Sequence, residues 1–371
     1  MADACRKLLT AIEILDTGFV VKDGKWTRVI PAPIKPTVRT FTTDSTIDDW
    51  SSDYIHREGY KPFEPGRPLV DIASCTTAAQ HRVHVHMSHA IYDGMCISRF
   101  WLTLKDLYEH GRTDKVASFS QYMAQVAMSK TAEASHYWYN LLKGATITSV
   151  GKITPQDKEF VWHAGVVGPR RVELGNKLQG RTCATVLKAA WALVLARQTG
   201  RNDVTFADLV SGRAGIDSSV TDALGMCSTP IPVRVRIEPS TTYADLVHTV
   251  QHQQLDSMAF ETEGFKHIAQ QCTDWPADSK PTSWINHVPQ RIASSLEIDG
   301  REYIISQPQQ EEQRWTFSET RISWTQLDDS LEFTLAYTAE KVPGNVALSL
   351  YNGLTSTLET ILSSPDALIG N

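Results

Sequence analysis

The sequence lacks the features that mark several classes of protein. Its 371 residues contain no run of 18 apolar residues, which excludes a helix that spans a bilayer. Positive charge is not in excess, because 36 Lys and Arg stand against 42 Asp and Glu and the net charge is −6. Nucleic acids and anionic membranes need concentrated positive charge, so neither partner is expected. The N-terminus runs directly into an amphipathic stretch, which is not the layout of a secretory signal.

Cysteine is too scattered to build a disulfide framework or a CxxC metal site. The six thiols are Cys5, Cys75, Cys96, Cys183, Cys227 and Cys272. Isolated thiols in a chain of this length indicate reduced and mostly buried residues. We therefore expect a cytoplasmic protein without structural disulfides.

Hydrophobic periodicity predicts a mixture of helices and strands along the whole chain. We expect helices over residues 2–15, 46–56, 94–108, 119–128, 132–142, 182–197, 242–257 and 346–362. We expect strands over residues 19–21, 26–30, 68–72, 83–88, 203–209, 232–237, 283–288, 322–325 and 331–337. The first two strands flank Asp23-Gly24, a pair that supplies the positive φ of a hairpin turn.

Residues 144–169 differ from their surroundings, because they are rich in Gly and Pro and show no long periodic segment. We place the boundary between two lobes there, with an N-terminal lobe over residues 1–150 and a C-terminal lobe over residues 151–371. Both halves mix helices and strands, so the predicted fold class is α/β, built as two sandwiches of similar size.

The most informative segment is SHAIYDG, residues 88–94, which follows an alternating strand. The strand delivers His89 to its end, and Asp93 is placed to cap the next helix. Histidine accepts a proton near neutral pH, so a rigid and exposed His89 suits a general base for an attacking amine or hydroxyl. Backbone amides near Asp93 and Gly94 would then help to stabilise an oxyanion.

A lone HxxxD pattern occurs by chance in many proteins, so each residue of the motif also has a purely structural interpretation. Ser88 either hydrogen-bonds a substrate or is a simple strand residue. Gly94 either leaves room for a thioester arm or only lets the helix begin. Tyr92 is expected to serve packing rather than catalysis.

Three further histidines precede the motif and raise the question of a metal. His84 and His86 share one face of the predicted strand, with His81 close by, but no cysteine or carboxylate stands beside them at ligand spacing. We therefore expect polar residues on a sheet face and no metal site.

SHAIYDG resembles the active-site motif HHxxxDG of condensation domains from nonribosomal peptide synthetases. Ser88 in the first position resembles the terminal, cyclising condensation-like domains of fungal synthetases. BAHD acyltransferases share the motif core, but their second signature, DFGWG, is absent here.

Other segments resemble this family in the right order along nearly the whole chain. They are ILDTGF at residues 14–19, FSQY at 119–122, HYW with LL at 136–142, VSGR at 210–213, LGMCSTPIPVRV at 224–235 and the HQQ-like helix around 251–255. The resemblance implies two chloramphenicol-acetyltransferase-like lobes in a V-shaped pseudo-dimer, with His89 in a tunnel between them. It also implies tunnel positions for Tyr92, Cys96, Ser228, Trp284 and Asn286.

The chain departs from the family pattern at three places. It begins inside the family's early helix, so we expect the family's first strand to be missing. Asp16 stands where the family has an Arg that pairs with the motif aspartate, Asp93. Two carboxylates repel each other, so we expect Arg39, Arg234 or Arg236 to replace that cation.

The third departure concerns the pocket floor and the helix that follows the motif. The family's HQN strand reads SWINHV at residues 283–288, and Cys96 stands where the fungal motif has a second serine. We therefore expect the floor of the pocket to differ from that of relatives.

These features predict an acyltransferase that takes a peptidyl or acyl thioester from the phosphopantetheine arm of a carrier protein or synthetase acting in trans. His89 would prepare an internal amine or hydroxyl for ring closure, and the chain itself would bind no cofactor. Two alternatives remain open at this point. One is the same fold acting on a free small molecule by cyclisation or rearrangement, and the other is a non-catalytic domain that docks carrier proteins.

Overall fold

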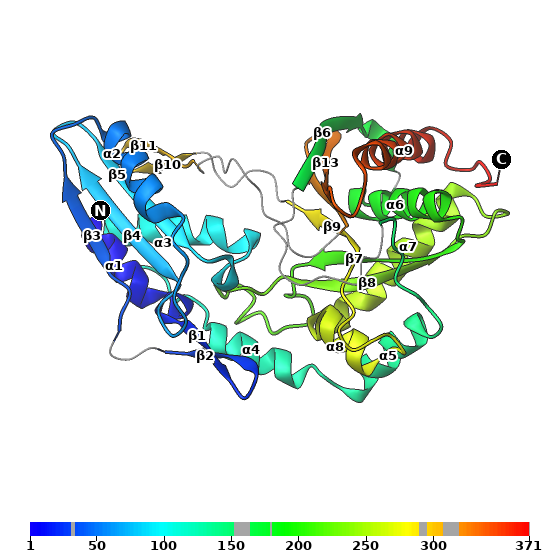
Figure 1. Ribbon diagram of the computed structural model, residues 1–371, viewed down its shortest axis with the longest axis horizontal. Coiled ribbons are helices and arrows are strands. Elements are labelled where there is room, and N and C mark those ends of the chain that lie inside the picture. The colour runs from blue at the N-terminus through cyan, green and yellow to red at the C-terminus, as the bar shows by residue number, and fades with distance from the viewer. Residues whose placement is uncertain (31–33, 152–163, 179, 289–294, 307–318, 371) are drawn as a thin grey trace. The chain divides into compact units, whose positions relative to one another are not determined.

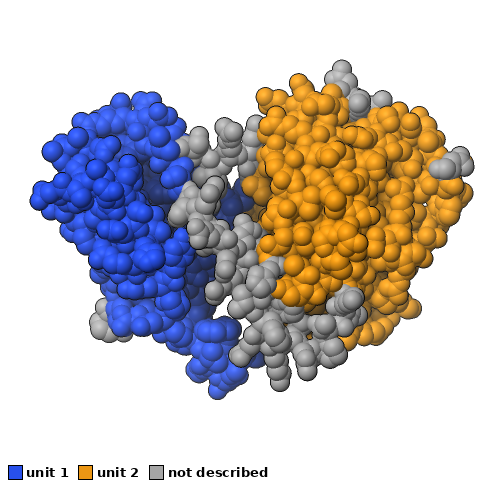
Figure 2. All heavy atoms as spheres, turned by 45° about the horizontal axis from the view of Figure 1, so that its top comes forward, with its two compact units in different colours: residues 1–125, 216–227, 292–306 blue, residues 126–215, 228–291, 307–371 orange. Residues whose placement is uncertain are grey.

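The computed structural model describes residues 1–30, 34–151, 164–178, 180–288, 295–306 and 319–370 (Figure 1). The chain forms two compact units, which Figure 2 distinguishes by colour. Unit 1 comprises residues 1–125, 216–227 and 292–306, and unit 2 comprises residues 126–215, 228–291 and 307–371. The sequence predicts a single division near residue 150. The structure differs because two later segments return to unit 1, so sequence order alone does not define the units.

Unit 1 is built on a three-stranded sheet with the order β3-β4-β5. Strand β4 (Val70–Thr76) pairs in parallel with β3 (Val38–Thr42) and antiparallel with β5 (His81–Met87). Helix α2 (Ile47–Tyr54) packs Trp50 and Tyr54 against Ala73 and Cys75 of β4. Alternation therefore directs the buried Ile72 to the other face of the sheet.

The remaining elements of unit 1 are helices and two hairpins. Helix α1 (Ala2–Ala11) packs on α3 (Gly94–His110), and a 3₁₀ turn, η1 (Glu13–Asp16), leads to strand β1. Asp23 and Gly24 turn the hairpin of β1 (Gly18–Lys22) and β2 (Lys25–Val29) with φ angles of 51° and 71°, as predicted. The other elements are η2 (Ile55–Gly59), η3 (His89–Ile91), most of α4 (Phe119–Met128), β10 (Ser295–Ile298) and β11 (Arg301–Ile304).

Unit 2 is built on a six-stranded mixed sheet with the order β6-β13-β12-β9-β7-β8. The strands are β6 (Ala164–Glu173), β7 (Asp203–Val210), β8 (Thr229–Arg236), β9 (Ser283–His287), β12 (Thr320–Gln326) and β13 (Ser330–Thr338). Its helices are α5 (Ala132–Leu142), α6 (Cys183–Thr199), α7 (Tyr243–Ser257), α8 (Gly264–Gln271) and α9 (Gly344–Ser363), with the short turns η4 (Gly175–Leu178) and η5 (Met258–Glu263).

Helices cover both faces of this sheet. Helices α6, α7 and α9 share the main core with Phe206 and Ile285, whereas Ala207 faces Phe265 of α8. Neighbouring strand residues such as Phe206 and Ala207 point to opposite faces, so both layers follow from the alternation. None of the described helices is long and apolar enough to cross a membrane.

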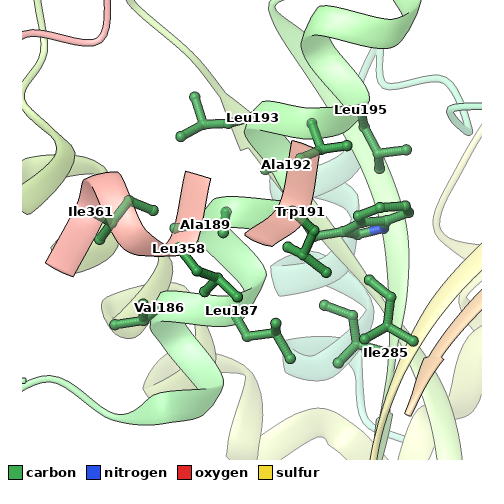
Figure 3. Packing of buried hydrophobic residues seen from close by; sticks show 14 of the residues in the cluster. Val186, Leu187, Ala189, Trp191, Ala192, Leu193, Leu195, Ile285, Leu358 and Ile361 are labelled. Atoms are coloured by element: carbon green, nitrogen blue, oxygen red, sulfur yellow. The ribbon is translucent and has the colours of Figure 1, made fainter. Parts of the chain in front are cut away.

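Helix α6 is the centre of the main core, as its predicted apolar character requires. Its residues from Cys183 to Ala196 are almost all buried (Figure 3). Trp191 is 0% exposed, and its indole Nε1 donates a hydrogen bond of 2.9 Å to the hydroxyl of Ser283 on β9. The bond fixes the position of the helix on the sheet.

Replacing Trp191 with alanine should lower the free energy of unfolding by about 3–5 kcal/mol, because the change leaves a large cavity in a close-packed core. The exposed Trp26, which retains 68% of its accessible surface, provides the matched control. Its replacement by alanine should change stability by no more than about 0.5 kcal/mol. Chemical denaturation measures both values, and equal effects would contradict this description of the core.

The structure adds elements that the sequence analysis did not predict, among them β3, β6, α8 and the pair β10–β11. Strand β6 was hidden because its glycines suggested a linker. A side chain at Gly165 would lie 2.1 Å from the ring of Tyr337, and one at Gly168 would lie 2.6 Å from the hydroxyl of Tyr351. Because these two glycines have no side chains, tyrosines of the neighbouring elements can lie close to β6. Glycine within a strand often marks such a close approach. Residues 152–163 of the predicted boundary lie outside the described residues.

Candidate functional site

His89 lies directly after the end of β5, as the sequence predicts. Ser88 caps the short turn η3, and its hydroxyl accepts a hydrogen bond of 3.3 Å from the amide of Ala90. Its own amide donates to Leu69 O at 3.0 Å. Ser88 therefore holds the turn that carries His89, a role that neither of its two sequence interpretations included. The His89 side chain is exposed.

The orientation of the His89 imidazole is set by Tyr92. The ring nitrogen Nδ1 lies 2.9 Å from the backbone carbonyl oxygen of Tyr92. A carbonyl oxygen only accepts, so Nδ1 carries the proton and donates it, and in the neutral imidazole the lone pair then lies on Nε2. The Tyr92 ring stacks on the imidazole at a centroid distance of 4.6 Å with an angle of 6° between the planes. Burial raises the pKa of the Tyr92 phenol, so this side chain packs and is not a base.

Asp93 is 2% exposed and caps helix α3. Its Oδ1 accepts hydrogen bonds from the amides of Met95 at 3.1 Å and Cys96 at 3.2 Å. Its Oδ2 accepts a third from the amide of Cys227 at 3.1 Å. Three amide donors compensate much of the cost of burying the carboxylate. The amides of Met95 and Cys96 are therefore engaged by Asp93. An oxyanion role for other amides near Asp93 and Gly94 stays a prediction.

The thiol of Cys96 strengthens the same junction. Its Sγ lies 3.2 Å from Asp93 Oδ1 and 3.0 Å from the carbonyl oxygen of Gly225. Burial, and after it the charge of Asp93, raises the pKa of Cys96 to about 11. The thiol therefore stays protonated and acts as a donor rather than a nucleophile. Cys96 is 4% exposed and belongs to unit 1, and its position in a tunnel stays a prediction.

The segment from Gly225 to Cys227 reaches Asp93 because Gly225 has no side chain. A Cβ atom there would lie 2.1 Å from Cδ2 of Phe119 on α4. The hydroxyl of Tyr122, one turn further along α4, donates to Cys227 O at 3.4 Å. Three segments that resemble family motifs therefore meet inside unit 1, although the chain separates them by up to about 130 residues.

The cation expected to replace the family arginine is not among the three residues considered. Arg39 pairs with Asp71 and with Glu58, and Arg234 and Arg236 both pair with Asp203. Asp16 forms an ion pair with Lys35, so its charge is compensated locally. The Asp16–Lys35 pair could not be predicted, because the spacing of the two residues does not place them side by side.

The histidines of β5 have structural partners. His81 hydrogen-bonds to the Thr76 hydroxyl at 2.8 Å, His84 to the Ser51 hydroxyl at 2.8 Å, and His86 stacks on Phe63 at 4.5 Å. Burial lowers the pKa of all three imidazoles, which favours their neutral forms. Among the described residues, no group of three or more His, Cys, Asp and Glu side chains is placed to hold a metal ion.

The other predicted site residues are placed as follows. Gly94 is exposed at the start of α3, and a Cβ atom there would meet open space, so the local packing does not require glycine. Ser228, Trp284 and Asn286 are half-buried residues of unit 2, the last two on β9. Their assignment to a tunnel with His89 stays a prediction.

Comparison with known proteins identifies the family. The condensation-domain family model matches residues 1–371, so the chain belongs to the condensation-domain family. Condensation domains are in general acyl or peptidyl transferases. The solved structure described as holo T3CT covers 99% of this chain and 85% of its own, with a TM-score of 0.86 and 20% identity. The X-domain in its complex with OxyB gives a TM-score of 0.76 at 19% identity, over 100% of this chain and 86% of the other. These likenesses confirm the predicted two-lobed fold of the chloramphenicol-acetyltransferase type.

Two similar curated proteins are synthetases from fungi. Nonribosomal peptide synthetase gloA of Glarea lozoyensis is 36% identical over 98% of this chain. Nonribosomal peptide synthetase ecdA of Aspergillus rugulosus is 29% identical over 99% of it. The chain spans about 5% of the length of either relative.

Proposed function

We propose that this chain transfers a peptidyl or acyl group from a thioester on the phosphopantetheine arm of a carrier protein to a nucleophile within the same substrate, which closes a ring. The observation that carries the proposal is the geometry of His89. Its Nδ1 proton is held by the Tyr92 carbonyl oxygen, and its exposed side chain offers Nε2 as a base.

The proposed reaction uses one proton acceptor and needs no covalent enzyme intermediate. The substrate's amine or hydroxyl attacks the thioester carbonyl carbon while His89 Nε2 takes its proton. The new C–N or C–O bond forms as the carbonyl electrons move to oxygen. When the carbonyl forms again, the C–S bond breaks, and the imidazolium returns its proton to the departing thiolate of the arm.

Asp93 contributes to this reaction by position. Its two oxygens accept amide hydrogen bonds from its own helix and from Cys227, so it is a structural brace for the turn that carries His89. These hydrogen bonds hold Asp93 in place, and with it the backbone of the preceding residue, Tyr92. The Tyr92 carbonyl oxygen therefore stays in the position that orients the His89 imidazole. Asp93 is therefore proposed as a positioning residue and not as a proton donor.

Cyclisation is favoured over transfer to a second carrier by the motif itself. Ser88 in the first motif position resembles the fungal terminal condensation-like domains, and the similar relatives are fungal peptide synthetases. In the structure the Ser88 hydroxyl caps η3. The histidine that stands first in the HHxxxDG motif would present an imidazole here in place of a hydroxyl. Carrier proteins and their phosphopantetheine arms are accordingly the proposed partners and substrates.

The identity of the released product tests this function. A carrier protein loaded with a linear peptidyl thioester is incubated with the chain, and the small-molecule fraction is analysed by mass spectrometry. We expect a ring whose mass is that of the linear acid less one water. A linear acid alone, or equal conversion of a free peptide without carrier, would contradict the proposal. The second result would favour the alternative in which the fold acts on a free small molecule.

A further inference from the structure

Two histidines lie side by side on helix α7 and have no part in the proposed reaction. His248 and His252 are four residues apart on this helix, and both side chains are exposed. Their rings meet edge to face, with a centroid distance of 4.3 Å and an angle of 62° between the planes. The two Nε2 atoms lie 3.1 Å from each other. Both residues belong to unit 2, whereas His89 belongs to unit 1.

The helix itself brings these two rings together. Residues four apart share one face of an α-helix, so their side chains are neighbours. The apolar residues Leu246, Val247 and Val250 of α7 are buried in the main core of unit 2. The two histidines therefore lie on the solvent side of a helix whose opposite side is held by packing. The positions of their ring nitrogens are prepared before any ligand arrives.

Two Nε2 atoms that face each other can share either a proton or a metal ion. Zinc binds an imidazole nitrogen at about 2.0–2.1 Å. An ion at that distance from both nitrogens, which are 3.1 Å apart, would form an N–metal–N angle of about 95–100°. This angle lies between those of octahedral and tetrahedral coordination, so α7 would need little rearrangement. Because both rings are exposed, each Nδ1 can carry its proton toward water and leave the Nε2 lone pair to the ion.

We propose that His248 and His252 together bind one divalent ion of the late first transition row, such as Cu²⁺, Ni²⁺ or Zn²⁺. Imidazole nitrogen suits these ions, whereas Mg²⁺ and Ca²⁺ take oxygen ligands. The described residues provide no group of three His, Cys, Asp and Glu that could hold a metal ion, so water completes the coordination shell. The six cysteines are buried and do not compete for the ion while the chain is folded.

Binding of such an ion should stabilise the folded chain. The helix holds the two nitrogens together, whereas in the unfolded chain the same residues are not fixed side by side. An ion that prefers the folded form raises its stability in proportion to the logarithm of the ion concentration above the dissociation constant. The melting temperature therefore reports binding independently of any heat of titration.

Titration of Zn²⁺ and Cu²⁺ into the untagged chain by isothermal calorimetry tests the proposal. We expect one saturable site, tighter binding of Cu²⁺ than of Zn²⁺, and no binding of Mg²⁺. Each bound ion should raise the melting temperature. The electron paramagnetic resonance spectrum of the copper complex should show coupling to the nitrogens of two imidazoles.

Variants locate the ion on α7. His248→Gln and His252→Gln each remove one of the two nitrogen ligands from an exposed position, so both variants should fold. Each should bind Zn²⁺ at least about ten-fold more weakly, because two linked ligands bind far more tightly than one. His136→Gln, which removes an exposed histidine from α5, is the matched control and should bind like the original chain. Circular dichroism establishes that each variant is folded.

Three results would overturn the assignment. They are the absence of saturable binding, undiminished binding by the two α7 variants, and an equal loss of binding in His136→Gln. His89→Ala should bind the ion normally, whatever the fate of the proposed acyl transfer. The two ideas can therefore fail separately.

Discussion

Replacing His89 with alanine should slow consumption of a carrier-bound thioester by on the order of 100- to 10,000-fold, the usual contribution of a general base. The fold should survive, since the side chain is exposed and forms one hydrogen bond within the described part of the chain, to Tyr92 O. Rates come from the time course of product formation at saturating substrate, and circular dichroism and the melting temperature establish that the variant is folded.

Tyr92→Phe is the matched control for this experiment. It keeps the stacked ring and the backbone carbonyl that orients His89, and it removes only the phenol hydroxyl. Its rate should stay within a few-fold of the original, since the pKa of a half-buried phenol is raised and the group does not act as a base. Full activity of His89→Ala, or a loss in Tyr92→Phe as large as that in His89→Ala, would contradict the assigned role.

Replacing Asp93 with alanine should cause the second large effect, and on stability as well as on rate. The change removes the cap of α3 and the charged acceptor of the buried Cys227 amide, which keeps a hydrogen bond of 3.0 Å to Gly225 O. A lost hydrogen bond to a charged group costs about 1.5–3 kcal/mol, and a lost helix cap about 0.5–2 kcal/mol. Displacement of the turn that carries His89 by about 1 Å should also lower the rate by on the order of 100-fold. Chemical denaturation and the product time course measure the two losses.

Cys96→Ser is the matched control for Asp93→Ala, because it keeps the Asp93 carboxylate and changes only a side chain beside it. A serine hydroxyl replaces the thiol as a donor toward Asp93 and Gly225 O, and serine stands at this position in the fungal form of the motif. This variant should retain most of the rate. An Asp93→Ala chain that is destabilised yet transfers at the original rate would show that the carboxylate supports the fold without positioning His89.

The local part of the site could be predicted because it is encoded within a few residues. Alternation over residues 83–88 defined the strand that carries His89, and Asp93-Gly94 marked the start of the next helix. Asp93 as a cap follows from its position alone. These features are confirmed because each depends on neighbours in the sequence.

The non-local part could not be predicted, because it depends on chain segments that only the fold brings together. The amide of Cys227 reaches Asp93 across about 130 residues, and Gly225 permits this through its contact with Phe119. The three arginines predicted as charged partners of Asp93 pair with other carboxylates, whereas backbone amides and a thiol supply the contacts of Asp93 described above. Every residue except proline has a backbone amide, so the residue types do not show which amide donates to Asp93.

Intact-protein mass spectrometry of a peptidyl carrier protein, incubated with this chain or with His89→Ala, tests whether His89 drives acyl transfer. We expect the original chain to remove the peptidyl group from the phosphopantetheine arm and the variant to leave the carrier loaded. If neither chain unloads the carrier although both bind it, the claim of acyl transfer is contradicted, and a non-catalytic docking role takes its place.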